Sequence, residues 1–451
     1  MDRLTDAAAP RKLRVAFATL GCKVNQYDTA TMEGALRDRC ELVPFESGAD
    51  VYVVNSCTVT DRADAESRQL ARRARRLNPA GRVVLTGCFA QTAAERAALP
   101  EIDYVIGVSR LPDLLRAVYD EIPANEGRVL VGGLRKADGV TTLGADVFPG
   151  HTRAFLKVQE GCDLFCSFCI VPTARGRSRS VPPRRVLDEL RRLAQRGFQE
   201  VVLTGIHLGG YGRDLTPALS LAELVEMIAA AAPLPRLRLS SLDPPEVTPR
   251  LLSSLRDSPV WCEHLHIPVQ SGADPVLRRM RRLYDVHVVR AVAAEVHRML
   301  PGAALGTDVI AGFPGETDAD AAATETLLAE AGFTYFHVFP YSRRRGTTAA
   351  KAVDHLPNEV IQRRARGLRQ LGARQRRTFA EAQRDAVLEV LVEQRRDAAG
   401  RLIGYSRNYV RAVLDGPDLL MNRIVRVRGV GCEQERVRTV LASEANADPA
   451  S

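Results

Sequence analysis

Short apolar runs alternate with stretches of helical period along most of this 451-residue chain, and this alternation limits the possible folds more than any other feature. In the first part, residues 12–126, we expect strands at 13–20, 51–54, 82–85 and 104–108, and helices at 28–39 and 64–77. Apolar strands with a helix between successive strands are typical of a parallel sheet covered on both faces. The first part is therefore predicted to be a flavodoxin-like α/β domain, whose ligands bind beyond the carboxyl ends of its strands.

Three of these strands end in a cysteine. VAFATLGC ends at Cys22, VYVVNSC at Cys57 and VVLTGC at Cys88. Because parallel strands have their carboxyl ends at one edge of the sheet, we expect the three thiols to meet there. Buried structural cysteines are common, but three of them at equivalent strand ends favour a site for a metal cluster.

A second α/β segment begins after residues 127–150, which are rich in glycine and polar residues and are interpreted as a linker. Expected strands lie at 154–158, 200–204, 236–239, 264–269, 304–311 and 335–339, with helices such as 183–196 and 286–300 between them. Six such units suit a partial (β/α)6 barrel over residues 151–380, open at one side. Chemistry is expected at the carboxyl ends of its strands, as in closed barrels. His266, within one of these strands, is interpreted as a packed residue rather than a ligand.

The loop after the first of these strands contains VQEGCDLFCSFC, with Cys162, Cys166 and Cys169 separated by three and then two residues. Three thiolates this close together can bind three irons of one [4Fe-4S] cluster and leave the fourth iron open. Zinc is the alternative metal. It normally takes four protein ligands, however, and no nearby His or Cys supplies a fourth.

The C-terminal part, residues 381–445, has the pattern of a small all-β domain. Short apolar runs in LEVLVEQ, NYVRAVL, RIVRVRGV and VRTVLAS are separated by turns, which suggests a closed or partly closed OB-like barrel. Tyr405, Arg407, Tyr409 and Arg411 alternate along one stretch, so base stacking and phosphate contacts could share a face. An arginine-rich helix expected over 357–384 is either a phosphate-binding stripe or a solvated surface.

Composition narrows the cellular context. The net charge of +9 is compatible with a polyanionic partner, although an arginine-rich composition would give the same value. No apolar run of about 18 residues occurs, and MDRLTDAAAPRK lacks the apolar core of a signal peptide, so we expect neither a membrane span nor secretion. The nine cysteines lie mostly in short motifs, many beside glycines, and fit metal binding in a reducing cytoplasm better than a disulfide framework.

The cysteine motifs resemble those of the radical S-adenosylmethionine (SAM) methylthiotransferase family. TLGCKVNQYDT, NSCTVT, GCFAQ and CIVPTARGRSRS carry the resemblance, which extends from about Lys12 to Ala442. It implies an auxiliary [4Fe-4S] cluster on Cys22, Cys57 and Cys88. It also implies a radical SAM cluster on Cys162, Cys166 and Cys169, whose open iron binds SAM, and a C-terminal TRAM domain that binds RNA.

The resemblance also places SAM or substrate near the ends of the later strands. The matching positions are Thr204, Gly205, Ser240, Asp243, Gln270, Gly312 and Phe313. For each of them the alternative is a structural role, because Gly and Pro commonly terminate strands.

TLGCKVNQYDT and HVFPYSRRRGT are most similar to the MtaB-type branch of the family, which modifies N6-threonylcarbamoyladenosine in tRNA. This implies an enzyme that adds a methylthio group to C2 of that base beside the anticodon, with SAM as methyl donor and as radical source. Arg343, Arg344 and Arg345 follow the sixth barrel strand and suit the carboxylate of a threonylcarbamoyl group. Solvent-facing arginines are the alternative there, and an isopentenyl substrate would require an apolar pocket instead.

The expected partners are a tRNA anticodon stem-loop, an electron donor such as a flavodoxin or ferredoxin, and a sulfur donor. The expected RNA contacts are Tyr405, Arg407 and Tyr409. Two alternatives remain open. One is the same chemistry on isopentenyladenosine or on a ribosomal protein, and the other is a non-catalytic Fe–S protein that binds RNA and senses iron or oxidants.

Overall fold

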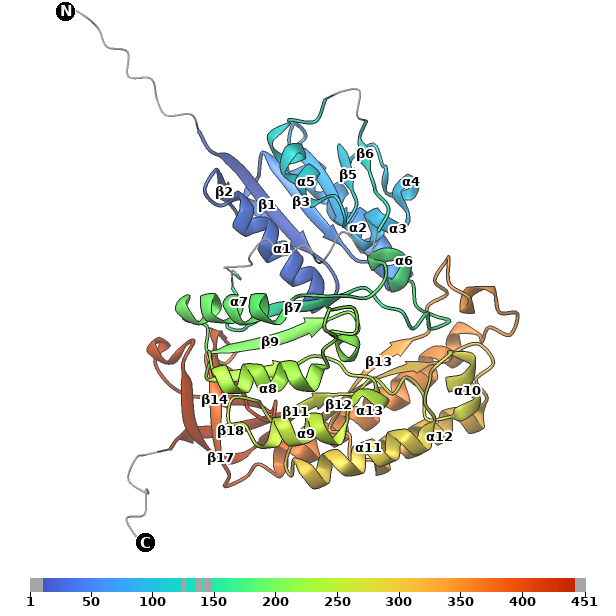
Figure 1. Ribbon diagram of the computed structural model, residues 1–451, viewed down its shortest axis with the longest axis vertical. Coiled ribbons are helices and arrows are strands. Elements are labelled where there is room, and N and C mark those ends of the chain that lie inside the picture. The colour runs from blue at the N-terminus through green and yellow to red at the C-terminus, as the bar shows by residue number, and fades with distance from the viewer. Residues whose placement is uncertain (1–10, 124–126, 135–139, 141–147, 149, 443–451) are drawn as a thin grey trace, which may run out of the picture. The chain divides into compact units, whose positions relative to one another are not determined.

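The computed structural model describes residues 11–123, 127–134, 140, 148 and 150–442 (Figure 1). Contacts divide the chain into two compact units. The first comprises Met1–Val147 together with Thr173–Arg175, and the second comprises Phe148–Pro172 and Gly176–Ser451.

The first unit is built on a six-stranded parallel sheet in the order β2-β1-β3-β4-β5-β6. Its strands are β1 (Leu13–Thr19), β2 (Cys40–Leu42), β3 (Val51–Ser56), β4 (Arg82–Gly87), β5 (Tyr104–Ile106) and β6 (Val129–Leu130). Its helices are α1 (Lys23–Leu36), α2 (Asp61–Leu77), α3 (Cys88–Thr92), α4 (Ala94–Ala97) and α5 (Leu111–Tyr119). The parallel sheet is as predicted, and its order shows the flavodoxin-like reversal of winding between β1 and β3.

Two apolar layers hold this sheet. Met32 and Leu36 of α1 pack with Leu114 of α5 on one face, and residues of α2 and α3 such as Ala71 and Phe89 pack on the other. Every residue of β3 is buried, as expected for a central parallel strand with helices on both faces. One boundary differs from the prediction. β6 pairs with β5 inside the stretch interpreted as a linker, because a two-residue strand has no periodicity to recognise.

The second unit begins with six parallel β–α repeats. The strands are β7 (Ala154–Glu160), β9 (Glu200–Gly205), β10 (Arg236–Leu239), β11 (His264–His266), β12 (Ala304–Ala311) and β13 (Tyr335–Pro340), with β8 (Arg179–Ser180) antiparallel to β7. The helices are α7 (Pro183–Gln195), α8 (Leu221–Ala231), α9 (Pro249–Arg256), α10 (Asp274–Arg279), α11 (Val286–Met299), α12 (Asp318–Glu330) and α13 (Asn358–Glu381). The short helix α6 (Val171–Arg175) is divided between the units, because its residues Thr173–Arg175 belong to the first. Single bridges join the sheet β10-β9-β7-β8 to the sheet β11-β12-β13. The result is the partial barrel that the sequence predicts.

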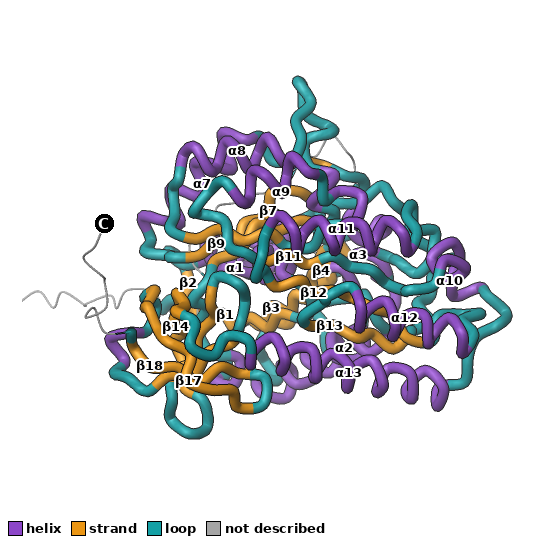
Figure 2. Tube along the Cα trace, turned by 90° about the horizontal axis from the view of Figure 1, so that it is seen from below, coloured by secondary structure: helices purple, strands orange, loops and turns teal. Residues whose placement is uncertain are grey.

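The C-terminal strands close into a small barrel in the order β14-β15-β16-β18-β17. They are β14 (Val387–Arg396), β15 (Leu402–Ser406), β16 (Arg411–Leu414), β17 (Ile424–Glu433) and β18 (Arg436–Leu441). Val390, Leu402 and Val427 lie in its core, and Figure 2 shows β14, β17 and β18 gathered as one group of strands. The predicted small all-β domain is therefore present. No described helix is long and apolar enough to span a bilayer.

Candidate active site

The three N-terminal cysteines follow adjacent strands of the first sheet. Cys22 comes after β1 and immediately precedes α1, Cys57 follows β3, and Cys88 follows β4 and begins α3. Gly21 packs so closely that a Cβ there would lie 2.8 Å from the Sγ of Cys57, and its φ of +97° favours glycine. The structure thus brings the three cysteines to one edge, where the winding of the sheet reverses and ligands bind in folds of this kind.

Asn25 and Arg175 organise this edge. The side-chain amide of Asn25 donates to the carbonyls of Leu20 and Ser56, at 2.7 and 3.0 Å, and so ties the ends of β1 and β3 together. The guanidinium of Arg175, which is only 2% exposed, donates from Nε to the Sγ of Cys88 at 3.2 Å and pairs with Asp28 at 2.6 Å. Burial raises the pKa of the Cys88 thiol to about 12, and the charge of Arg175 opposes that rise. Arg175 is therefore placed to stabilise a thiolate.

The second cysteine set lies in the loop after β7. Gly161 has a φ of +74° and packs against the carbonyl of Arg177, with no room for a Cβ, which fixes the start of the loop. The backbone N–H of Ser167 donates to the carbonyl of Met280, and its hydroxyl donates to that of Arg279. These contacts anchor the cysteine loop to the end of α10.

Arg282 donates to a thiol of the second cysteine set, as Arg175 does in the first set. It donates to the Sγ of Cys166 at 3.1 Å, pairs with Asp243, and has a side chain that is 5% exposed. Burial raises the pKa of the Cys169 thiol to about 12 and that of Cys162 to about 11. A buried arginine therefore accompanies each set of thiols. Neither arginine was predicted from the sequence as a site residue, and only Arg175 lies within a motif that carries the resemblance.

The two cysteine sets fit [4Fe-4S] clusters better than zinc. Within the described residues, neither set is among the groups of three or more metal-binding side chains whose ligand atoms all lie within 4.8 Å of one another. Zinc, with Zn–S bonds of about 2.3 Å, would hold its sulfur ligands within about 4 Å of each other. A [4Fe-4S] cluster is larger than a zinc ion, so its cysteine sulfurs can lie further apart. Its negative charge also suits the buried arginines.

Several residues predicted to contact SAM lie at the carboxyl ends of the barrel strands, but some are engaged in packing. Thr204 and Gly205 end β9, and a Cβ on Gly205 would lie 2.9 Å from the side chain of Gln159. The N–H of Gly312 donates to Glu316, and Phe313 is buried in an apolar cluster. Gln270 pairs in backbone hydrogen bonds with Asp308 and Ile310. These contacts directly support a structural role for these positions, which was the alternative to SAM binding.

Asp243 is the predicted position most closely tied to the cysteines, through Arg282. It lines a cavity of about 750 Å³ together with Cys166, Tyr211, Glu246 and Tyr284. Burial raises the pKa of Asp243 and Arg282 lowers it. This volume lies within the range of cofactor pockets, about 300–1,000 Å³. Ser240 is buried at the end of β10.

The arginines after β13 are not equivalent. Arg343 and Arg345 are exposed, whereas Arg344 is buried and its carbonyl accepts hydrogen bonds from Thr347. Arg343 also donates to the carbonyl of Ala350 at 2.9 Å. The exposed arginines lie past the carboxyl end of a barrel strand, on the side where the chemistry is expected.

Of the predicted RNA-contacting residues of the C-terminal barrel, Tyr405 and Tyr409 line one cavity, whereas Arg407 is turned toward the α/β barrel. Arg407 pairs with Glu263 and donates to the carbonyl of Trp261 at 2.6 Å. The ring of Tyr409 stacks on Tyr405, with centroids 5.0 Å apart, and contacts His264. These residues do not alternate along a straight strand, because β15 ends at Ser406 and Tyr409 has a φ of +63°.

Several arginines of α13 form ion pairs within the protein. Arg364 pairs with Glu316 and Asp318, Arg376 pairs with Glu435, and Arg377 pairs with Glu381. Phosphate contacts from this helix would therefore come from its other arginines.

Comparisons with known proteins agree with this arrangement. The model of Uncharacterized protein family UPF0004 matches residues 14–107, and that of the Radical SAM superfamily matches residues 156–328. The chain is 38% identical to threonylcarbamoyladenosine tRNA methylthiotransferase MtaB of Bacillus subtilis, over 92% of this chain and 93% of that protein. It is 34% identical to tRNA-2-methylthio-N(6)-dimethylallyladenosine synthase of Moorella thermoacetica, over 91% of this chain and 94% of that protein.

Solved structures show the same fold. The radical S-adenosylmethionine methyltransferase TsrM from Kitasatospora setae aligns with a TM-score of 0.54 at 17% identity, over 73% of this chain and 74% of that one. At this identity the likeness concerns the fold alone. It confirms the predicted radical SAM barrel.

Proposed function

The chain belongs to the radical SAM methylthiotransferase family, and we propose that it methylthiolates C2 of an N6-threonylcarbamoyladenosine beside the anticodon of a tRNA. The observation that carries the choice of substrate is the cationic loop after β13, where Arg343 and Arg345 are exposed. A threonylcarbamoyl group has a carboxylate that an arginine binds in a charge-assisted hydrogen bond. A dimethylallyl group, the substituent named for the Moorella relative, would be better served by apolar side chains.

Enzymes of this family use SAM and [4Fe-4S] clusters, and these cofactors, when bound, supply the radical and sulfur chemistry that side chains lack. In our proposal Cys22, Cys57 and Cys88 hold one cluster, and the loop of Cys162, Cys166 and Cys169 holds the other. Arg175 and Arg282 offset the negative charge of the thiolates within low-dielectric surroundings.

The chain must also position the base. An adenosine in a single-stranded loop leaves its stack at lower cost than one in a duplex, which favours an anticodon loop as substrate. Asp243 and Tyr284 line the cavity beside Cys166 and are placed to orient a cofactor there. An electron donor such as a flavodoxin or ferredoxin and a sulfur donor complete the proposed partners, in the reducing cytoplasm that unpaired thiols require.

The proposed substrate is tested with two anticodon stem-loops that differ only in the group on N6 of the target adenosine. The enzyme should methylthiolate the threonylcarbamoyl stem-loop and leave the isopentenyl one unmodified, as judged by mass spectrometry of the digested RNA. Arg345→Leu, which replaces an exposed charge by an apolar group, should raise KM for the preferred substrate. Modification of the isopentenyl stem-loop alone would refute the assignment of the substrate and leave the chemistry intact.

Exposed arginines of the C-terminal barrel should contribute to tRNA affinity. Arg426 and Arg428 lie on the outer face of β17, so replacing both with glutamine should weaken binding and reduce the slope of log K against log salt by about 1 for each lost phosphate contact. The matched control is Arg290→Gln with Arg298→Gln, two arginines of α11 that already pair with glutamates. Filter-binding titrations at several salt concentrations measure both variants. If both double variants showed the same slope of log K against log salt, the arginines of β17 would not contact RNA.

A further inference from the structure

Strand register brings three metal-binding side chains together inside the α/β barrel. In the parallel neighbours β11, β12 and β13, His266 is level with Gly306, and Asp308 is level with His337. Residues two apart on a strand point to the same face, so His266, Asp308 and His337 share one side of the sheet. The opposite side carries Phe336, which packs against Gly372 of α13. The three side chains therefore face the interior of the barrel and not the surrounding helices.

The ligand atoms of these residues converge on one point. The Nε2 of His266 and the Nδ1 of His337 each lie 3.0 Å from the Oδ1 of Asp308. All three atoms are within 4.8 Å of one another. Two imidazoles and one carboxylate form a common ligand set for zinc or ferrous iron.

An outer group fixes the orientation of the buried imidazole. The hydroxyl of Tyr335 lies 3.2 Å from the Nδ1 of His266 and 2.7 Å from the Nε2 of His264. His266 is 7% exposed, and Tyr335 is buried. Metal-binding histidines commonly hold their second ring nitrogen in such a contact, which sets the tautomer and aims the first nitrogen at the ion.

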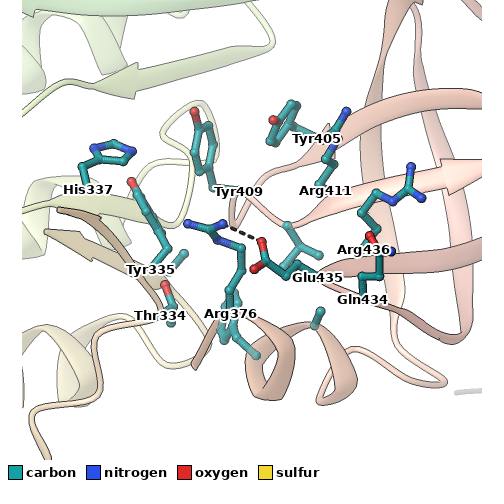
Figure 3. Close-up of a pocket in the computed structure, with 14 residues that line it drawn as sticks. Thr334, Tyr335, His337, Arg376, Tyr405, Tyr409, Arg411, Gln434, Glu435 and Arg436 are labelled. Atoms are coloured by element: carbon teal, nitrogen blue, oxygen red, sulfur yellow. Dashed lines mark hydrogen bonds and ion pairs between the residues drawn. The ribbon is translucent and has the colours of Figure 1, made fainter. Parts of the chain in front are cut away.

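The third ligand opens onto a cavity. His337 is 56% exposed and lines, with Tyr335, a cavity of about 790 Å³ between β13, α13 and the C-terminal barrel (Figure 3). Arg376 on its wall is paired with Glu435 at 2.5 Å, which offsets its repulsion of a cation. Arg411 and Arg436 also line this space. An ion bound to the three side chains would keep coordination positions free for water or for an anionic oxygen in the cavity.

We propose that His266, Asp308 and His337 bind a divalent transition-metal ion of the zinc type, at a site distinct from both cysteine sets. The sequence favours a packed role for His266, because neither Asp308 nor His337 is near it in the chain. A network of hydrogen bonds without metal would give the same three residues a purely structural role.

Zinc retention tests this proposal. The enzyme with both clusters reconstituted, so that the cysteine thiols are occupied, is incubated with one equivalent of ZnCl2, passed through a desalting column and analysed for zinc and iron. We expect about one zinc per chain in the wild type and several-fold less in His337→Ala and Asp308→Asn, with unchanged iron. The matched control is His287→Ala, which removes an exposed histidine of α11 and should retain zinc as the wild type does.

X-ray absorption at the zinc edge identifies the ligands. Nitrogen and oxygen neighbours at about 2.0–2.1 Å, without sulfur at about 2.3 Å, support the site. Absence of retained zinc in the wild type, equal zinc in the wild type and His337→Ala, or sulfur ligation would each overturn the proposal. Because His337 is half-exposed, its variant should fold even if Asp308→Asn does not. Bound zinc is measured in the absence of RNA, so the result does not depend on the proposed substrate.

Discussion

Replacing Cys57 with alanine is expected to remove about half of the bound iron and to abolish methylthio transfer while SAM cleavage continues. Cys57 lies between the other two N-terminal thiols in strand order, against Gly21, and two remaining thiolates cannot hold a cluster that needs three. The cysteine set of the second unit is untouched. Iron analysis, the yield of 5'-deoxyadenosine and mass spectrometry of the RNA measure the three effects separately.

The matched control for this variant is Cys40→Ala. Cys40 is buried in the same sheet, with its Sγ 3.7 Å from the hydroxyl of Tyr119, and belongs to neither cysteine set. It should keep its full iron content and its activity. Unchanged iron in Cys57→Ala, or loss of SAM cleavage in a variant that melts like the wild type, would contradict the division of labour between the two sets.

Arg175→Gln is expected to lower methylthio transfer by about 10- to 100-fold and to weaken retention of the first cluster. The change removes a buried charge that donates to Cys88 and pairs with Asp28, so it leaves both groups without their cationic partner. SAM cleavage should change much less. Arg175→Lys keeps the charge and should recover part of the cluster, because one ammonium cannot replace a guanidinium that contacts several groups.

The control lies two residues further along the chain, just past the end of α6. Arg177 is 60% exposed and pairs with Asp163, a surface contact worth at most about 1 kcal/mol. Arg177→Gln should therefore leave cluster content and SAM cleavage close to those of the wild type. Equal loss of iron in both variants would mean that the whole segment around residues 175–177 affects the cluster, and that the Arg175 guanidinium has no specific role beside Cys88.

The fold was predictable because its signals are local. An apolar run followed by a helical stretch indicates a parallel strand, and the carboxyl ends of parallel strands lie at one edge of the sheet. Cys22, Cys57 and Cys88 could therefore be grouped from the sequence alone. The same reasoning located the loop of Cys162, Cys166 and Cys169 at the end of a barrel strand. The start of α1 was less clear, since polar residues such as Asn25 interrupt the apolar pattern of its first turn.

What the sequence could not reveal depends on contacts between distant residues. Arg175 reaches Cys88 across 87 positions and Arg282 reaches Cys166 across 116, and no periodicity encodes such pairs. The convergence of His266, Asp308 and His337 likewise depends on strand register. At Tyr405, Arg407 and Tyr409 an alternating pattern predicted one shared face, but the strand ends at Ser406, so the two tyrosines line a cavity while Arg407 pairs with Glu263.

The most direct test of the account compares the modified nucleosides of bulk tRNA from cells with and without this gene. We predict that 2-methylthio-N6-threonylcarbamoyladenosine disappears when the gene is deleted, that N6-threonylcarbamoyladenosine accumulates in its place, and that a copy carrying Cys57→Ala fails to restore the product. Unchanged levels of both nucleosides, or a loss confined to methylthiolated isopentenyladenosine, would contradict it.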